Sequence, residues 1–118
     1  DEGLADTTWN YDKNGEQWCM DLHRGSTDPY YFGTLEIGCQ KPGEERYEIL
    51  YTGFWKMNDN YLDLLMTDTD GNRTAIYYPV EIDPSGENLY IEANPSSMET
   101  PPFMEKTQES AIMTISFG

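Results

Sequence analysis

Apolar and polar residues alternate along most of this chain, and that alternation is the main structural signal in its sequence. Side chains of a β-strand point in turn to opposite faces, so a period of two gives each strand one apolar face. The pattern contains no helical stripe of useful length. Eight segments alternate in this way: 7–11, 16–22, 31–39, 46–55, 61–66, 74–82, 88–93 and 111–117. The pattern therefore predicts an all-β protein of about eight strands.

Strict alternation also predicts which side chains share a face. In the fourth segment Tyr47, Ile49 and Tyr51 fall on one side, and in the last segment the apolar row ends at Phe117. We expect these rows to face the core, because one apolar face per strand is what a two-sided sheet buries.

Three connections share one turn chemistry, which predicts tight hairpins. The sequences are "DKNG" at 12–15, "DTDG" at 68–71 and "DPSG" at 83–86, each with Asp first and Gly fourth. Asp caps the backbone of a type I turn, and Gly accepts the left-handed conformation that follows. Neighbouring strands should therefore pair antiparallel, in meander order.

The register of each hairpin follows from bringing apolar faces together. The three turns need different registers for this match, so they share chemistry but not loop type. The expected partners are Tyr11 with Trp18, Trp9 with Met20, Leu62 with Tyr78, Leu64 with Ile76, Val80 with Ile91, and Ile82 with Leu89.

Eight antiparallel strands in this order predict a closed or partly open barrel, with a β-sandwich as the alternative. The length of 118 residues favours a single domain over 1–118. The segment 94–109 is too long for a hairpin and carries three prolines. Since long ordered loops usually act as lids or coverings, we expect it to cross one open end and to bury Met98, Phe103 and Met104.

The charge narrows the classes of partner. The chain carries 22 Asp and Glu against seven Lys and Arg, a formal net charge of −15. A surface of this sign repels phosphate backbones, so we expect no nucleic-acid partner. No run of 18 apolar residues occurs, so we expect no membrane insertion. The acidic composition, rich in Tyr, Asn and Gly and poor in Lys, favours an extracytoplasmic protein, secreted or anchored at the cell surface.

The turn "DTDG" resembles a calcium loop in its letters but not in its spacing. With Gly71 at the sixth position of an EF-hand loop, Asp68 and Asp70 would be ligands three and five. Positions one and twelve would then be Met66 and Tyr77, which carry no carboxylate. We therefore predict a turn with a bulge at Gly71 and no metal.

The cysteines and the single histidine give no sign of catalysis. Cys19 and Cys39 lie on consecutive predicted strands, where they could form a disulfide or stay two small buried thiols. Together with His23 they offer no paired ligand spacing for zinc. We interpret His23 as a surface residue and predict no catalytic residue, no cofactor and no enzyme activity.

Aromatic residues outside the expected core are the strongest functional signal. The stretch "DPYYF" sets three rings in a row, and several tyrosines fall on faces opposite the apolar rows. Such rings beside Asp and Asn suit sugar stacking or a protein interface, although cross-strand packing on the barrel wall would also account for them. The candidate ligand-binding residues are Tyr30, Tyr31, Phe32, Trp55, Tyr61, Tyr77 and Tyr90.

The N-terminal sequence, up to the first predicted strand, resembles that of one barrel family. "LADTTW" places Leu4 ahead of Trp9 at the first strand, which is similar to the lipocalin-like (calycin-type) barrels of small bacterial extracytoplasmic lipoproteins. The usual glycine two residues before the tryptophan is replaced here by Thr7. The resemblance implies a cup-shaped barrel with an internal or mouth-side pocket and no catalytic residues.

Three functions fit these observations. The first is a non-enzymatic, extracytoplasmic domain that binds a small or extended ligand in a barrel pocket. The second is a carbohydrate-binding β-sandwich module with aromatic rings on its surface, and the third is a protein-interaction or scaffold domain. The position of the rings separates them: a ring-lined cavity favours the first, an aromatic strip the second, and scattered rings the third.

Overall fold

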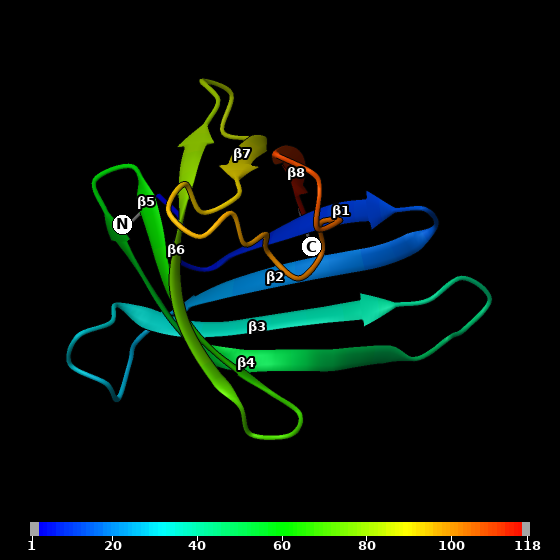
Figure 1. Ribbon diagram of the computed structural model, residues 1–118, viewed down its shortest axis with the longest axis horizontal. Helices are drawn as coiled ribbons and strands as arrows, with labels where there is room; N and C mark the ends of the chain where they lie inside the picture. The colour runs from blue at the N-terminus through cyan, green and yellow to red at the C-terminus, as the bar shows by residue number, and fades with distance from the viewer. Residues whose placement is uncertain (1–2, 117–118) are drawn as a thin grey trace.

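The computed structural model describes residues 3–116 and shows an all-β fold, with no helix in that range. Eight antiparallel strands follow one another in meander order and close into a barrel, as the alternation predicts (Figure 1). The strands are β1 (Thr7–Lys13), β2 (Glu16–Arg24), β3 (Gly33–Gln40), β4 (Tyr47–Asn58), β5 (Tyr61–Asp68), β6 (Arg73–Ile82), β7 (Asn88–Glu92) and β8 (Ser110–Ile115). The alternative β-sandwich is therefore excluded. Phe117 lies outside the described residues.

The predicted hairpin registers are confirmed. Each of the six predicted cross-strand partners is observed across the three Asp–Gly turns. In "DTDG" the Gly71 N–H donates to the Asp68 carbonyl at 3.1 Å, and Gly71 takes the left-handed φ of +88° that the bulge needs. In "DKNG" both Asn14 and Gly15 have positive φ, as a two-residue turn requires.

The core is the filled interior of the barrel. Inward positions from all eight strands meet there, and the barrel holds few polar side chains. Large fully buried side chains are Trp9, Met20, Leu22, Leu35, Ile37, Trp55, Leu62, Leu64, Tyr78 and Leu89. Because these side chains occupy the interior, the barrel resembles a packed core more than an open cup.

The N-terminal segment is fixed to this core. Leu4 is buried, and its carbonyl accepts a 2.6 Å hydrogen bond from the Thr7 hydroxyl. The same Thr7 oxygen accepts a 2.8 Å bond from Nε1 of buried Trp9. Thr7 thus satisfies a buried indole that would otherwise lack a partner.

A bulge in the β3–β4 pair changes the faces on which the β4 side chains lie, so one predicted apolar row does not form. The register shifts between Ile37 and Gly38, so residues before and after the shift no longer keep one alternation. Tyr51 packs against the core, whereas Tyr47 and Ile49 are exposed. The prediction that all three share a buried face is therefore wrong, because an added residue in β4 reverses the direction of the side chains before it.

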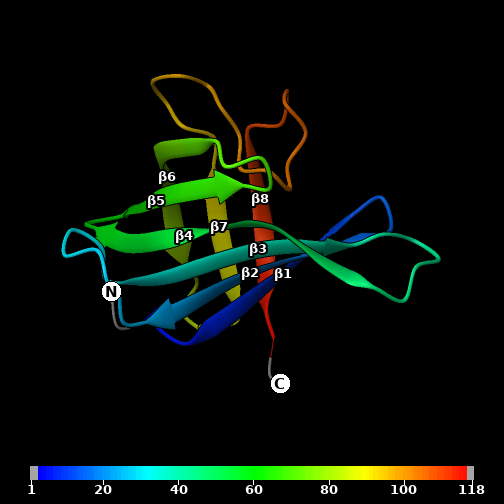
Figure 2. The ribbon, with the colours of Figure 1, turned by 90° about the horizontal axis from the view of Figure 1, so that it is seen from below.

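The segment 94–109 joins β7 to β8 and runs across the front of the barrel in Figure 1. Figure 2 shows it at the top of the view, above β6 and β8. Phe103 and Met104 are buried, and the Phe103 ring lies 5.7 Å from that of Tyr11. Met98 is 64% exposed, contrary to expectation: it lies in a turn, with a positive φ of 61°, where its N–H donates to the Asn94 carbonyl at 2.8 Å. No helix among residues 3–116 is long and apolar enough to cross a membrane.

The turn at 83–87 gives a pH prediction. Hydrogen bonds from Asn88 and then Ser85 lower the pKa of Asp83 from 3.8 to about 2. A carboxyl with a lowered folded pKa stabilises the fold above its unfolded pKa, and this contribution disappears as pH falls to the folded pKa. The stability advantage of the wild type over Asp83→Asn should thus be constant above about pH 5 and shrink towards pH 2.

Urea unfolding of both proteins at several pH values measures that difference. The other carboxylates contribute the same pH dependence to both proteins, so their contribution cancels in the difference. A side-chain carboxyl NMR titration of Asp83 checks the pKa directly. A gap that stays constant between pH 4 and pH 2 would show that the turn does not hold the carboxylate as described.

Candidate functional site

Two of the seven candidate aromatics belong to the core. Trp55 is fully buried, and its Nε1 donates a 2.9 Å hydrogen bond to the His23 carbonyl. Phe32 packs on the same region, with its ring 5.2 Å from that of Trp55. Arg24 covers this Phe32 ring at 5.7 Å. We therefore remove Trp55 from the ligand-binding residues, because it has no surface to offer, and assign Phe32 to the packing of the barrel end.

Four of the candidates gather on the outer wall of β4, β5 and β6. Outward positions of these strands align in rows, with Lys56, Asp63 and Tyr77 opposite one another across the sheet. Side chains from the loop 25–32 lie over the β4 end of this wall. We call the surface the aromatic face, and its residues are Tyr30, Tyr31, Phe54, Tyr61 and Tyr77 with Lys56 and Asp63.

The loop side of the aromatic face is a set of stacked rings. The Tyr31 ring stacks on Phe54 at 5.9 Å and 22°, and meets Tyr30 edge-on at 4.8 Å. Lys56 Nζ lies 4.1 Å from the centre of the Tyr30 ring, a cation–π contact. The Tyr30 hydroxyl donates a 3.4 Å bond to Asp63. Burial raises the pKa of the Tyr31 phenol.

The β6 side of the aromatic face is a pair of perpendicular rings. Tyr61 and Tyr77 lie 5.1 Å apart at 81°. The Tyr77 hydroxyl shares a 3.1 Å hydrogen bond with Ser96 of the segment 94–109. Asn94, which is buried, donates a 2.8 Å bond to the Tyr77 carbonyl and so ties that segment to β6. The rings are therefore held by the barrel wall on one side and by the long loop on the other.

Sequence reasoning missed Phe54, Lys56 and Asp63. All three sit at outward positions, and the signal was present in the alternation, since they flank the inward residues Trp55, Leu62 and Leu64. The alternation does not predict the position of the loop 25–32. Only the folded loop brings Tyr30 and Tyr31 over this part of the wall.

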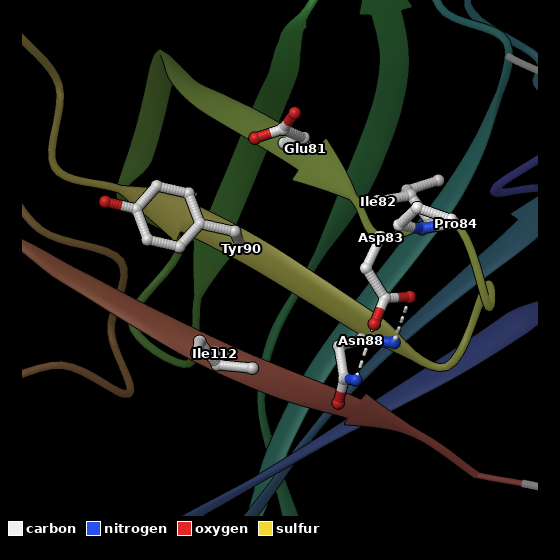
Figure 3. A pocket seen from close by; sticks show the side chains of 7 residues that line it. All are labelled: Glu81, Ile82, Asp83, Pro84, Asn88, Tyr90 and Ile112. Carbon is white, nitrogen blue, oxygen red and sulfur yellow. Dashed lines mark hydrogen bonds between the residues drawn. The ribbon is translucent and has the colours of Figure 1, made fainter.

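Tyr90 lies apart from the aromatic face, in a groove over β6, β7 and β8 (Figure 3). It stands opposite Glu81 on β6 and opposite Ile112 on β8. The volume of the groove is about 580 Å³, within the range of ligand sites. We call it the β6–β8 groove, and its residues are Glu81, Ile82, Asp83, Asn88, Tyr90 and Ile112, beside Pro84.

A smaller depression of about 240 Å³ adjoins this groove. It shares Glu81 and Tyr90 with the groove and adds Pro79 and Glu92. No lysine or arginine is among the residues that line either of these two hollows. The Tyr90 region is thus continuous, apolar in its floor and acidic at its border.

The two cysteines stay free thiols. Cys19 pairs with Gly38 and Cys39 with Trp18, so the side chains point to opposite faces of the β2–β3 hairpin. A disulfide between them is therefore not formed. Burial raises the pKa of both thiols, which is opposite to the shift that activates a cysteine nucleophile. Residues 3–116 contain no group of three or more His, Cys, Asp and Glu side chains that could hold a metal ion.

Comparison with known proteins assigns no family to the chain. No family model, no curated protein and no solved structure matches it. A functional interpretation therefore rests on the side chains of the aromatic face and of the β6–β8 groove.

Proposed function

We propose that this protein is a non-enzymatic, extracytoplasmic binding domain that recognises an extended glycan on its aromatic face. The observation that carries the proposal is the gathering of five rings on one outer wall, where two strands and a loop contribute neighbouring tyrosines. In the interpretation of the sequence, an aromatic strip of this kind separates glycan binding from the other two functions.

The chemistry of the aromatic face suits a sugar chain. The C–H faces of a sugar ring are apolar and pack on aromatic rings, while its hydroxyls need donors and acceptors nearby. Tyr30, which is 57% exposed, offers ring area beside the charged groups of Lys56 and Asp63. Tyr77 and Ser96 add two hydroxyls at the other side. A net charge of −15 favours neutral over acidic glycans.

A ligand inside the barrel is the weaker alternative. Trp9, Trp55 and Tyr78 fill the interior together with the aliphatic core, which leaves the outer wall as the better place for a ligand. The lipocalin-like layout remains a prediction from Leu4 and Trp9. Under this proposal the barrel acts as a rigid support for the aromatic face, and no catalytic group or cofactor is needed.

Removal of single rings tests the proposal. Neutral glucan, xylan and mannan hexasaccharides are titrated into the protein and followed by NMR. We expect one of these classes to bind, and Tyr30→Ala and Tyr61→Ala each to weaken it roughly tenfold, because a central aromatic contact is worth more than 1 kcal/mol. Tyr90→Ala is the matched control, since Tyr90 is as exposed as Tyr61 but lies outside the aromatic face.

Two results would count against the proposal. One is the absence of shifts for all three glycan classes, and the other is binding that survives Tyr30→Ala and Tyr61→Ala together. Either result would leave the rings as cross-strand packing on the barrel wall.

A further inference from the structure

The β6–β8 groove combines an exposed apolar floor with carboxylates at its border. Ile112 is 61% exposed and Tyr90 is 38% exposed, and they lie on neighbouring strands as a direct cross-strand pair. Ile82 adds a third exposed apolar side chain at the end of β6. Grouped exposed apolar side chains with a polar rim mark an interaction site more often than isolated ones do.

The carboxylates of the groove are not neutralised by the protein itself. The two ion pairs found within residues 3–116 join Lys13 to Glu105 and Arg24 to Asp6, away from this groove. Glu81 stands directly opposite Tyr90. Two side-chain hydrogen bonds of 2.7 Å, from Asn88 and Ser85, hold the Asp83 carboxylate in the adjoining turn (Figure 3 shows the bond from Asn88).

We propose that the β6–β8 groove is a docking site for an extended, basic segment of a partner protein. An aliphatic side chain of that segment lies on Tyr90 and Ile112, and the lysines or arginines beside it meet Glu81 and Asp83. The neighbouring depression at Pro79 and Glu92 receives the next cation, since it shares Glu81 and Tyr90 with the groove.

Charge complementarity selects this occupant. The hollows are lined by acidic, amide and apolar side chains and by no basic one, so an anionic or acidic partner would be repelled. A second copy of the chain carries the same net charge of −15, with only seven Lys and Arg, and is disfavoured on the same ground. Arginine suits Tyr90 in addition, because a guanidinium can stack on a ring while it pairs with a carboxylate.

The β6–β8 groove shares no lining residue with the aromatic face. Tyr77 of the aromatic face contacts Tyr61 and Ser96 of the long loop, whereas Tyr90 faces Glu81 and Ile112. A failure of glycan binding therefore leaves the docking proposal intact, and the reverse is also true.

The test uses three synthetic octapeptides with the whole chain: alternating Leu-Lys, alternating Ser-Lys and alternating Leu-Glu. We expect the Leu-Lys peptide to bind with a micromolar Kd and to shift amide NMR signals of β6, β7 and β8. The Ser-Lys peptide should bind at least tenfold more weakly, and the Leu-Glu peptide should not bind. Ile112→Ser and Glu81→Gln should each weaken the Leu-Lys peptide five- to tenfold, whereas Ile49→Ser, which changes an exposed isoleucine of β4 outside both hollows, should leave its affinity unchanged.

Other outcomes overturn the proposal. Equal affinity of the Leu-Lys and Ser-Lys peptides, or shifts spread over the whole surface, would mean general attraction to the acidic protein only. Unchanged binding by Ile112→Ser, with a circular dichroism spectrum like the wild type, would place the peptide elsewhere. Sedimentation that shows dimers of the wild type but not of Ile112→Ser would assign the groove to a second copy of the chain. Absence of binding by all three peptides would also overturn it.

Discussion

Replacing Trp55 with alanine is expected to lower the free energy of unfolding by about 3–5 kcal/mol, the cost typical of deleting a buried Trp or Phe side chain. Trp55 is fully buried and lies near the end of the barrel where β2, β3 and β4 meet. Truncation removes the packing surface of Phe32 and leaves the His23 carbonyl without the indole donor. Both losses act in the same direction.

Close packing around the indole explains why the surroundings cannot collapse into the gap. Gly33 approaches Trp55 so closely that a Cβ atom there would lie 2.6 Å from Nε1 and 1.7 Å from the His23 carbonyl oxygen. These backbones are held by the β2–β3 and β3–β4 ladders. A cavity at Trp55 therefore persists, and a persistent cavity is what raises the cost of large-to-small changes.

Urea unfolding followed by circular dichroism measures the effect. Tyr61→Ala is the matched control, since it also removes a ring from the barrel but from a half-exposed outer position, and it should cost less than about 1.5 kcal/mol. Trp55→Phe should fall between the two, because it keeps most of the volume but loses the hydrogen bond. A Trp55→Ala cost no larger than that of Tyr61→Ala would contradict the structural role of Trp55.

Trp55 shows what the alternation of apolar and polar residues can predict and what it cannot. Counting by twos from Tyr51 places Trp55 inward, and the structure agrees. Alternation does not say whether an inward ring lines a cavity or fills a core, because that depends on the summed volumes of side chains from all eight strands. Here Trp9 and Tyr78 occupy the same interior, so an inward ring is packed and not open to a ligand.

The hairpins were predictable because their information is local. An Asp at the first turn position and a Gly at the fourth mark the turn, and matching apolar faces fixes the register, as in the pairing of Leu62 with Tyr78. The bulge at Gly38 was not predictable in this way. Next to the bulge Tyr47 lies over Gly38, where a Cβ atom would be 2.4 Å from the Tyr47 ring, and this close contact between β3 and β4 is not visible in the alternation of either strand.

The candidate surfaces were predictable in part for the same reason. Outward tyrosines such as Tyr61 and Tyr77 follow from the alternation of β5 and β6. Tyr31 was expected within a strand, but β3 begins at Gly33, so the ring belongs to a loop that folds back onto Phe54. That contact joins residues distant in sequence, and no period of two encodes it.

Gly53→Ala is expected to destabilise the barrel by about 3 kcal/mol, through overpacking against backbone atoms. A Cβ atom at Gly53 would lie 1.7 Å from the Leu65 carbonyl oxygen, far inside van der Waals contact. Gly53 pairs with Leu35 of β3 and with Met66 of β5, so strands hold it on both sides. The clash therefore cannot be relieved by a rotamer change, only by moving a hydrogen-bonded strand.

Gly3→Ala is the matched control, because a Cβ atom at Gly3 meets nothing within 4 Å and Gly3 has no left-handed φ. It should change the free energy of unfolding by less than about 0.5 kcal/mol. The cost at Gly53 should appear as a lower urea midpoint with an unchanged slope, since the folded barrel persists but is strained. It should also weaken amide exchange protection in β4 and β5 first, because these are the strands that must separate to admit the methyl group. A Gly53→Ala protein as stable as Gly3→Ala would mean that β4 and β5 do not approach as closely as the barrel requires.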